Sequence, residues 1–273
     1  MNYRHAYHAG NAADCLKHAL LVLLLRALTR KAKPLFVLDT HAGLGAYDLA
    51  GPEAGRTSEW ESGIGRLRAA SPAALADYLA LVPPGLAYPG SPAIARALLR
   101  PGDRLALCEL HPEDAAALKR RFRGDPTAQV HARDGYEAVS ALLPPAERRA
   151  LVLIDPPFER PDEFAVLART LDAGRRKFPT GVFAAWYPVK HRAPVRDFMA
   201  DIAARGIPDV IACEMLIRPA LDPARLNGSG LLVINPPYGF EAAASPVLEA
   251  LRATLGEEEA STAIIRLAGE DVR

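Results

Sequence analysis

Cysteine is scarce in this sequence, where only Cys15, Cys108 and Cys213 occur among 273 residues. They lie far apart in apolar surroundings and form no Cys-x-x-Cys pair, which argues against a disulfide framework and against a zinc ribbon. The histidines near the N-terminus match no zinc-ligand spacing either. We therefore expect buried thiols in a reducing compartment and no metal site.

Long apolar runs are missing as well. The longest, Ala19–Leu25, is flanked by basic residues and is far too short to span a bilayer. Met1 is followed by the polar residues Asn2-Tyr3-Arg4-His5 instead of a charged and then apolar leader, so no signal peptide is expected. These absences predict a cytoplasmic protein with no membrane partner.

An excess of charge is absent too, since the formal net charge is +1. Such a protein is not attracted to polyanions as a whole, so nucleic-acid binding would need a local patch. Residues 1–33 form such a patch, with six Lys or Arg against one acid, Asp14. It opens with an arm, residues 1–13, whose Tyr, Arg and His side chains suit base stacking and phosphate contact. We expect the arm to belong to a nucleic-acid site, and Lys190-His191-Arg192 to extend the same positive surface.

What the sequence does contain is an alternation of short apolar runs with helical patterns. Continuous apolar runs are typical of strands buried on both faces of a parallel sheet. Their alternation with helices predicts a doubly wound α/β fold. The expected strands are Leu35–Leu38, Leu105–Cys108, Val130–Ala132, Leu151–Ile154 and Gly181–Trp186. The expected helices are one that follows Asp14 and stops at Pro34, then Pro92–Leu99, Pro112–Phe122, Glu137–Leu142 and Phe164–Leu171.

Two segments depart from this alternation. Residues 51–89 delay the second strand and contain a helical segment, Pro72–Val82, which predicts a small helical insertion. Val210–Ile217 and Gly230–Ile234 are joined without a helical pattern and therefore predict an antiparallel hairpin. With ordinary proportions of apolar and charged residues, we expect a single domain over residues 1–273.

Acids follow three successive expected strands. Asp39 leads into the turn Gly43-Leu44-Gly45, which lets a ligand approach bare backbone at the switch point of an open sheet. Glu109 can accept hydrogen bonds from the ribose hydroxyls of a nucleoside cofactor, and Asp134 from an adenine amino group. Each also has an ordinary interpretation, as a tight turn or a helix-capping carboxylate. Their order along the sheet favours a nucleoside-binding crevice.

The motif Asp155-Pro156-Pro157-Phe158, directly after an expected strand, points to the chemistry. Two prolines fix a rigid turn. The Asp155 carboxylate and the Pro156 carbonyl can both accept hydrogen bonds from one amino group, which aims the nitrogen lone pair at an electrophilic methyl group. Phe158 offers a face on which an unstacked base can lie.

A second motif, Asn235-Pro236-Pro237-Tyr238, can hold an amine in the same way. It ends the expected hairpin, however, and an antiparallel strand would place it at the opposite edge of the sheet from the cofactor. We therefore favour Asp155 over Asn235.

Together these features resemble the RlmJ family of bacterial adenine-N6 methyltransferases of 23S ribosomal RNA. The resemblance covers nearly the whole chain and is carried by Tyr3-Arg4-His5-Ala6-Tyr7-His8-Ala9-Gly10-Asn11, Asp14-Cys15-Leu16-Lys17-His18, Tyr88-Pro89-Gly90-Ser91-Pro92 and Trp186-Tyr187-Pro188. It implies a Rossmann-like class I methyltransferase fold, a helix that begins with Ser91 as its N-cap, and S-adenosylmethionine as the cofactor. Its substrate would be 23S ribosomal RNA, protein-free or in an early assembly intermediate, and the protein would be a monomer.

The resemblance also implies roles for individual residues. Cofactor contacts fall on His18, His41, Ser91, Glu109, Asp134, Gly135 and Asp155. Asp155 is the catalytic acceptor, and Tyr3 would contact the substrate RNA. From the chemistry of the arm and of the Asp155 motif we also expect RNA contacts at Arg4, His5, Pro156 and Phe158. Phe158 stands where the family more often has Tyr, which preserves stacking and removes a hydroxyl.

Three other functions remain open at this stage. A DNA adenine methyltransferase would use the same motif, although no separate DNA-reading segment is apparent. A non-catalytic RNA-binding protein is disfavoured by the intact Asp155-Pro156-Pro157-Phe158. A nicotinamide-dependent oxidoreductase is disfavoured because Asp48 replaces the last small residue of the dinucleotide fingerprint.

Overall fold

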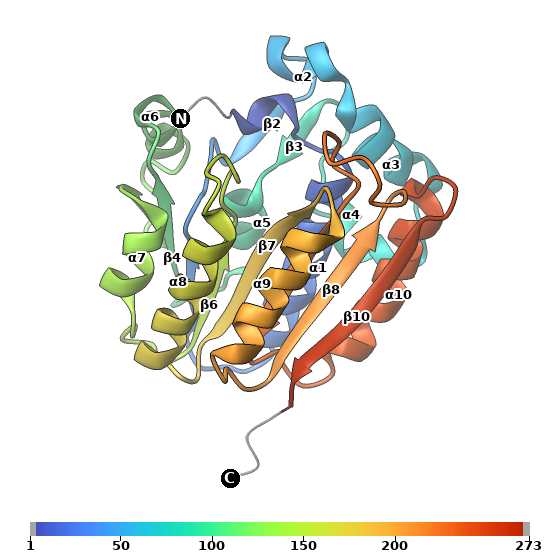
Figure 1. Cartoon of the computed structure of the whole chain (residues 1–273). Coiled ribbons are helices and arrows are strands. Elements are labelled where there is room, and N and C mark those ends of the chain that lie inside the picture. The colour runs from blue at the N-terminus through green and yellow to red at the C-terminus, as the bar shows by residue number, and fades with distance from the viewer. Residues whose placement is uncertain (1–3, 270–273) are drawn as a thin grey trace.

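A twisted eight-stranded sheet forms the centre of the computed structural model, which describes residues 4–269 (Figure 1). The strand order is β10-β8-β9-β7-β6-β1-β4-β5. The five strands from β7 to β5 run parallel, β9 lies antiparallel between β7 and β8, and β10 lies antiparallel to β8. This confirms the mostly parallel sheet with an antiparallel hairpin. The strands are β1 (Phe36–Asp39), β4 (Arg104–Glu109), β5 (Ala128–Ala132), β6 (Ala150–Ile154), β7 (Val182–Val189), β8 (Val210–Leu216), β9 (Gly228–Ile234) and β10 (Ser261–Ala268).

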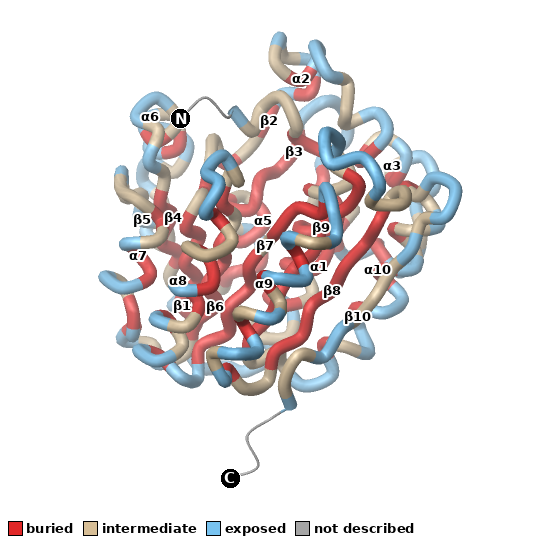
Figure 2. The backbone as a smooth tube through the Cα atoms, in the orientation of Figure 1, coloured by how far each residue is buried: buried red, intermediate tan, exposed pale blue. Residues whose placement is uncertain are grey.

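Helices cover both faces of the sheet, and the central strands are buried between them (Figures 1 and 2). Side chains alternate between the two cores, so that Val37 packs on one face while Phe36 and Leu38 pack on the other. This is why the strands read as continuous apolar runs. One face carries α1 (Ala12–Thr29), α5 (Ser91–Leu98), α6 (Pro112–Arg121) and α10 (Phe240–Leu255), and the other carries α7 (Gly135–Leu142), α8 (Glu163–Lys177) and α9 (Arg192–Ala204).

Helical insertion elements lie between two short strands, β2 (Ala46–Asp48) and β3 (Ala87–Pro89), which pair with each other. The expected helix Pro72–Val82 is shorter than predicted and is divided into a 3-10 turn and a helical turn. The elements are α2 (Pro52–Thr57), η2 (Glu61–Gly65), α3 (Arg66–Ala70), η3 (Ala73–Leu75) and α4 (Ala76–Leu79).

Several element ends differ from the prediction. The first helix is capped by Asn11, whose side chain accepts the Asp14 N–H, so Asp14 lies inside the helix. The predicted N-cap Ser91 is wrong: Gly90 occupies that position with extended backbone, and the Ser91 side chain makes no capping bond. Strand β7 continues through Pro188, which lies near its end. Strand β10, at the sheet edge, was not predicted.

Candidate active site

A cavity of about 860 Å³ opens where the parallel strands end. This volume is within the range of small-molecule sites. Segments that follow β1, β4, β5 and β6 contribute to its walls, as do the end of β7 and the start of α1. Tyr3 lies outside the described residues. The other predicted site residues all line the cavity: Arg4, His5, His18, His41, Ser91, Glu109, Asp134, Gly135, Asp155, Pro156 and Phe158.

Glu109, the last residue of β4, is held in place by a hydrogen bond from the turn that follows β1. Its carboxylate accepts the Gly43 N–H at 2.9 Å and the His111 N–H at 2.8 Å. Burial raises the pKa of Glu109, although these backbone donors act in the opposite direction. Gly43 has a φ of 57°, and a Cβ there would lie 2.4 Å from the Tyr47 hydroxyl. Glycine is therefore required at this turn, and bare backbone faces the cavity beside the carboxylate.

Asp134 caps helix α7 as well as lining the cavity. Its Oδ1 accepts the Tyr136 N–H at 2.7 Å and the Glu137 N–H at 3.1 Å. The capping interpretation of this acid is thus correct, and it leaves Oδ2 outside both bonds. Gly135 permits close packing, because a Cβ there would lie 2.0 Å from the Thr40 carbonyl oxygen.

Asp39, the third acid of the predicted crevice, is not among the residues that line the cavity. Its side chain is fully buried, and neither carboxylate oxygen has a hydrogen-bond partner of good geometry among residues 4–269. Burial raises the pKa of Asp39 to about 7. The acid therefore lies beneath the site.

Lys17, for which we predicted no role from the sequence, makes the main contact to Asp155. Its ammonium lies 2.6 Å from Asp155 Oδ2 and 2.8 Å from Asp14 Oδ1. The Lys17 side chain is 5% exposed and that of Asp155 is 15% exposed. Burial alone would lower the pKa of Lys17, but attraction to the two carboxylates raises it well above its usual value. A buried cation thus joins Asp155 to helix α1.

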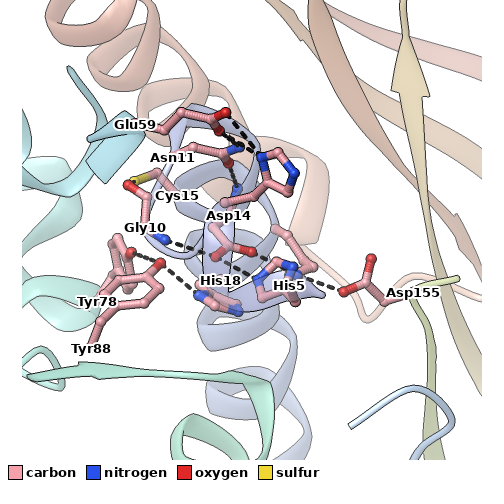
Figure 3. A network of polar contacts seen from close by, with 12 residues as sticks. His5, Gly10, Asn11, Asp14, Cys15, His18, Glu59, Tyr78, Tyr88 and Asp155 are labelled. Atoms are coloured by element: carbon pink, nitrogen blue, oxygen red, sulfur yellow. Dashed lines mark hydrogen bonds and ion pairs between the residues drawn. The ribbon is translucent and has the colours of Figure 1, made fainter. Parts of the chain in front are cut away.

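Asp14 also contacts the N-terminal arm, through His5 and Gly10 (Figure 3). Its Oδ2 lies 2.9 Å from His5 Nε2 and accepts the Gly10 N–H at 2.9 Å. Burial would raise the pKa of Asp14, but His5 and Lys17 hold it well below its usual value. A charged pair three residues apart within an apolar helix was the sequence signal for this network.

The helical insertion holds the other end of the arm. The Glu59 carboxylate lies 3.0 Å from His8 Nδ1 and accepts the Asn11 side-chain N–H at 2.9 Å (Figure 3). Gly63 packs so closely that a Cβ there would lie 2.1 Å from the Gly10 carbonyl oxygen. The arm has no acid of its own, but its basic side chains meet carboxylates from elsewhere, including Glu113 opposite Arg4. Residues 4–11 are consequently anchored beside the cavity.

Aromatic rings line the cavity next to Asp155. Phe158, in left-handed backbone with a φ of 49°, packs edge-to-face against Phe164 and Trp186 at 4.8 and 5.8 Å between ring centroids. The Trp186 indole N–H has no hydrogen-bond partner among residues 4–269. Phe158 and Trp186 form an apolar wall of the cavity with one unpaired donor, and the role of Trp186 in this wall was not predicted.

Two histidines on the cavity wall are neutral. Burial lowers the pKa of His18 to about 3 and that of His41 to about 4. His18 Nδ1 lies 2.8 Å from the Tyr88 hydroxyl, and His41 Nδ1 lies 2.7 Å from the Thr40 hydroxyl. They can offer hydrogen bonds to a ligand without adding charge.

The Asn235 motif is remote from this site. Because β9 runs antiparallel to β7, Asn235 emerges beside the start of β7, where its side-chain amide donates to the carbonyls of Pro179 and Gly181, both at 2.8 Å. Tyr238 is fully exposed. The topological reason for preferring Asp155 is confirmed.

Residues 4–269 contain neither a metal-binding cluster nor a helix that could span a membrane. No group of three or more His, Cys, Asp or Glu side chains there is arranged to hold a metal ion. Within the same range, every helix is too short or too polar to cross a membrane.

Comparison with known proteins gives the family. The model described as "Ribosomal RNA large subunit methyltransferase D, RlmJ" matches residues 32–266. The chain belongs to the RlmJ family. Two curated proteins named "Ribosomal RNA large subunit methyltransferase J", from Haemophilus influenzae and Escherichia coli, are 40% and 41% identical over 94% and 93% of this chain and 95% and 94% of their own.

A solved structure is similar to this RlmJ-family chain over almost its full length. The crystal structure of protein LPL1258 from Legionella pneumophila superposes with a TM-score of 0.87 at 35% identity, covering 95% of this chain and 98% of that chain. The fold and the family thus agree.

Proposed function

We propose that this RlmJ-family protein transfers a methyl group from S-adenosylmethionine to the N6 amino group of an adenine in 23S ribosomal RNA. The observation that carries the proposal is the position of Asp155, held by Lys17 and adjoining the Phe158 and Trp186 wall within one cavity. The curated relatives are named as methyltransferases of the large-subunit RNA, which supports this class of substrate.

The cavity residues fit S-adenosylmethionine. Glu109 can accept hydrogen bonds from ribose hydroxyls, and Asp134 can accept one from the adenine amino group on its Oδ2. The turn at Gly43 presents backbone without a side chain in the way. His18, His41 and Ser91 supply neutral polar groups around it. When bound, the cofactor supplies an electrophilic methyl group on a positively charged sulfur.

The chain's own residues position the amine. Asp155 Oδ2 is engaged by Lys17, so Oδ1 accepts one amine hydrogen and the Pro156 carbonyl accepts the other. Phe158 lies against the base, and the aromatic wall excludes water from the amine. Because a sulfonium is already a good leaving group, catalysis consists mainly of orientation and desolvation. Asp155 then receives the proton that the nitrogen loses as it is methylated.

RNA binding would involve the anchored arm and the rim of the cavity. Arg4 and His5 line the cavity, and Lys190 lines it from the segment after β7. His191 and Arg192, which we expected to extend this surface, are instead engaged in capping α9 and in pairing with Glu214. We propose that a monomer acts in the cytoplasm on protein-free RNA or an early assembly intermediate.

The proposal is tested with purified protein, labelled S-adenosylmethionine and a 23S ribosomal RNA transcript, followed by nuclease digestion and mass analysis of the nucleosides. The expected product is N6-methyladenosine from the RNA and none from duplex DNA assayed in parallel. Label on another atom or only in the DNA would contradict it.

A further inference from the structure

A second cavity, of about 330 Å³, adjoins the active site. It lies between the start of α1, the insertion and the loop 217–227 that joins β8 to β9. Four residues line both cavities: Asn11, Ala13, Glu59 and Leu226. The two spaces are therefore neighbours, at the separation of adjacent parts of one bound molecule. We call this second space the flanking cavity.

Ser229 indicates that the flanking cavity is built for a polar ligand. The residue lines it, is 1% exposed, and has a hydroxyl without a hydrogen-bond partner among residues 4–269. Most buried polar groups in proteins are paired, so an unpaired one calls for a partner that completes it. A hydroxyl both donates and accepts, which suits the mixed edge of a nucleobase.

The rest of the lining divides into an apolar part and a positive part. Met215, Ile217 and Leu226 supply apolar surface. On the positive side, Arg225 is exposed and its side chain makes no ion pair or hydrogen bond with another described residue, whereas Arg218 is already held by Glu257. The N-terminus of the 18-residue helix α1 also faces this space. Because Asn11 caps this helix and donates to Glu59, the exposed Arg225 is the group left to meet a phosphate. Apolar walls beside this cation match a base joined to a phosphate.

We propose that the flanking cavity holds the nucleotide next to the target adenosine in the substrate RNA. Its base lies on the apolar wall with an edge on Ser229, and its phosphate lies at Arg225. Glu59, whose carboxylate is already bonded to His8 and Asn11, keeps the phosphate on the Arg225 side by repulsion. Single-stranded RNA is read in this way, through unstacked bases in separate pockets. This inference rests on the proposed function and adds a second recognition site to it.

The test uses wild-type protein and RNA substrates in which each nucleotide beside the methylated adenosine is made abasic in turn. At one flanking position the missing base should raise KM roughly five- to a hundredfold, as loss of one base contact does. Ser229→Ala and the cavity-filling Ala12→Leu should remove most of that penalty. Ser229→Ala should not lower the melting temperature, because the hydroxyl has no hydrogen-bond partner among residues 4–269 and an unpaired buried hydroxyl does not stabilise the fold.

Arg225→Ala tests the phosphate contact, with Arg169→Ala on helix α8 as the matched exposed control. Arg225→Ala should weaken RNA binding and lower the slope of log affinity against log salt by about 1, while S-adenosylmethionine affinity and kcat stay unchanged. The inference is overturned if no flanking base matters, if the penalty survives both cavity variants, or if the salt slope matches that of the control. Absence of methyl transfer to any RNA by the wild type would instead remove the proposed function itself.

Discussion

Replacing Lys17 with Met is expected to disable the site while leaving the cofactor end intact. Lys17 bridges the buried Asp14 and Asp155, the proposed catalytic acceptor, at 2.8 and 2.6 Å. Methionine fills much of the same space but provides no charge. Asp155 then loses the contact that fixes its position, and Asp14 keeps its contacts to His5 and the Gly10 N–H.

The expected loss of stability and rate follows from the burial of the ion pairs that Lys17 makes with Asp14 and Asp155. Removing one partner from a buried ion pair destabilises a protein by about 3–5 kcal/mol, and the partial exposure of Asp155 places the expected loss near the lower figure. A displacement of about 1 Å at a reacting group costs on the order of a hundredfold in rate. We expect kcat for RNA methylation to fall at least that far, with S-adenosylmethionine affinity within about twofold of wild type because Glu109 and Asp134 are untouched.

The assay pairs urea unfolding with methyl transfer to 23S ribosomal RNA and calorimetry of cofactor binding. Lys31→Met, at an exposed position after α1, is the matched control and should change none of the three. A folded Lys17→Met protein with wild-type kcat would refute the reasoning that Lys17 positions Asp155.

Three further predictions concern the cofactor, the arm and pH. Glu109→Ala should weaken S-adenosylmethionine binding roughly ten- to a hundredfold, as loss of charge-assisted hydrogen bonds does, and calorimetry showing unchanged affinity would remove its ribose role. Deleting residues 2–8 should abolish RNA methylation with cofactor affinity largely retained, and normal turnover by that protein would show that the arm is dispensable. The Glu59 hydrogen bond raises the pKa of His8. Burial acts to raise the pKa of Glu59, but hydrogen bonds from His8 and Asn11 lower it. The pair's contribution to stability should therefore be full between pH 4.5 and pH 6.5, lost as pH rises through the raised pKa of His8, and lost as pH falls through the lowered pKa of Glu59. In thermal unfolding across pH, the melting temperature of His8→Gln should fall less than that of wild type both above the pKa of His8 and below the pKa of Glu59.

Much of the fold was predictable because its signals are local. Strands buried on both faces must be continuously apolar, and this placed β1, β4 and β6 within one residue of their observed ends and β7 within one residue of its start. Strand β10 was not predicted because it lies at the sheet edge with three of its eight residues exposed and none buried, so its pattern is mixed. The individual helices of the insertion were not predicted because each is only one or two turns long.

Residues that line the cavity were predictable where an acidic side chain follows an expected strand. Glu109, Asp134 and Asp155 come directly after expected strands, and parallel strands bring their carboxyl ends to one edge. The links between them were not predictable in this way. Lys17 and Asp155 are 138 positions apart, and only the packing of α1 against the sheet brings them together. Ser229 and Trp186 could not be singled out from the sequence either, because what marks them is a buried polar atom without a hydrogen-bond partner among residues 4–269.

Methyl transfer to 23S ribosomal RNA by Asp155→Ala and Asn235→Ala, compared with wild type at equal folded concentration, tests the central claim most directly. Asn235→Ala removes two bonds to the carbonyls before β7, so it should lose stability and keep its rate per folded molecule. Asp155→Ala should nearly abolish transfer while still binding S-adenosylmethionine. Full activity in Asp155→Ala, or loss of activity confined to Asn235→Ala, would contradict the account.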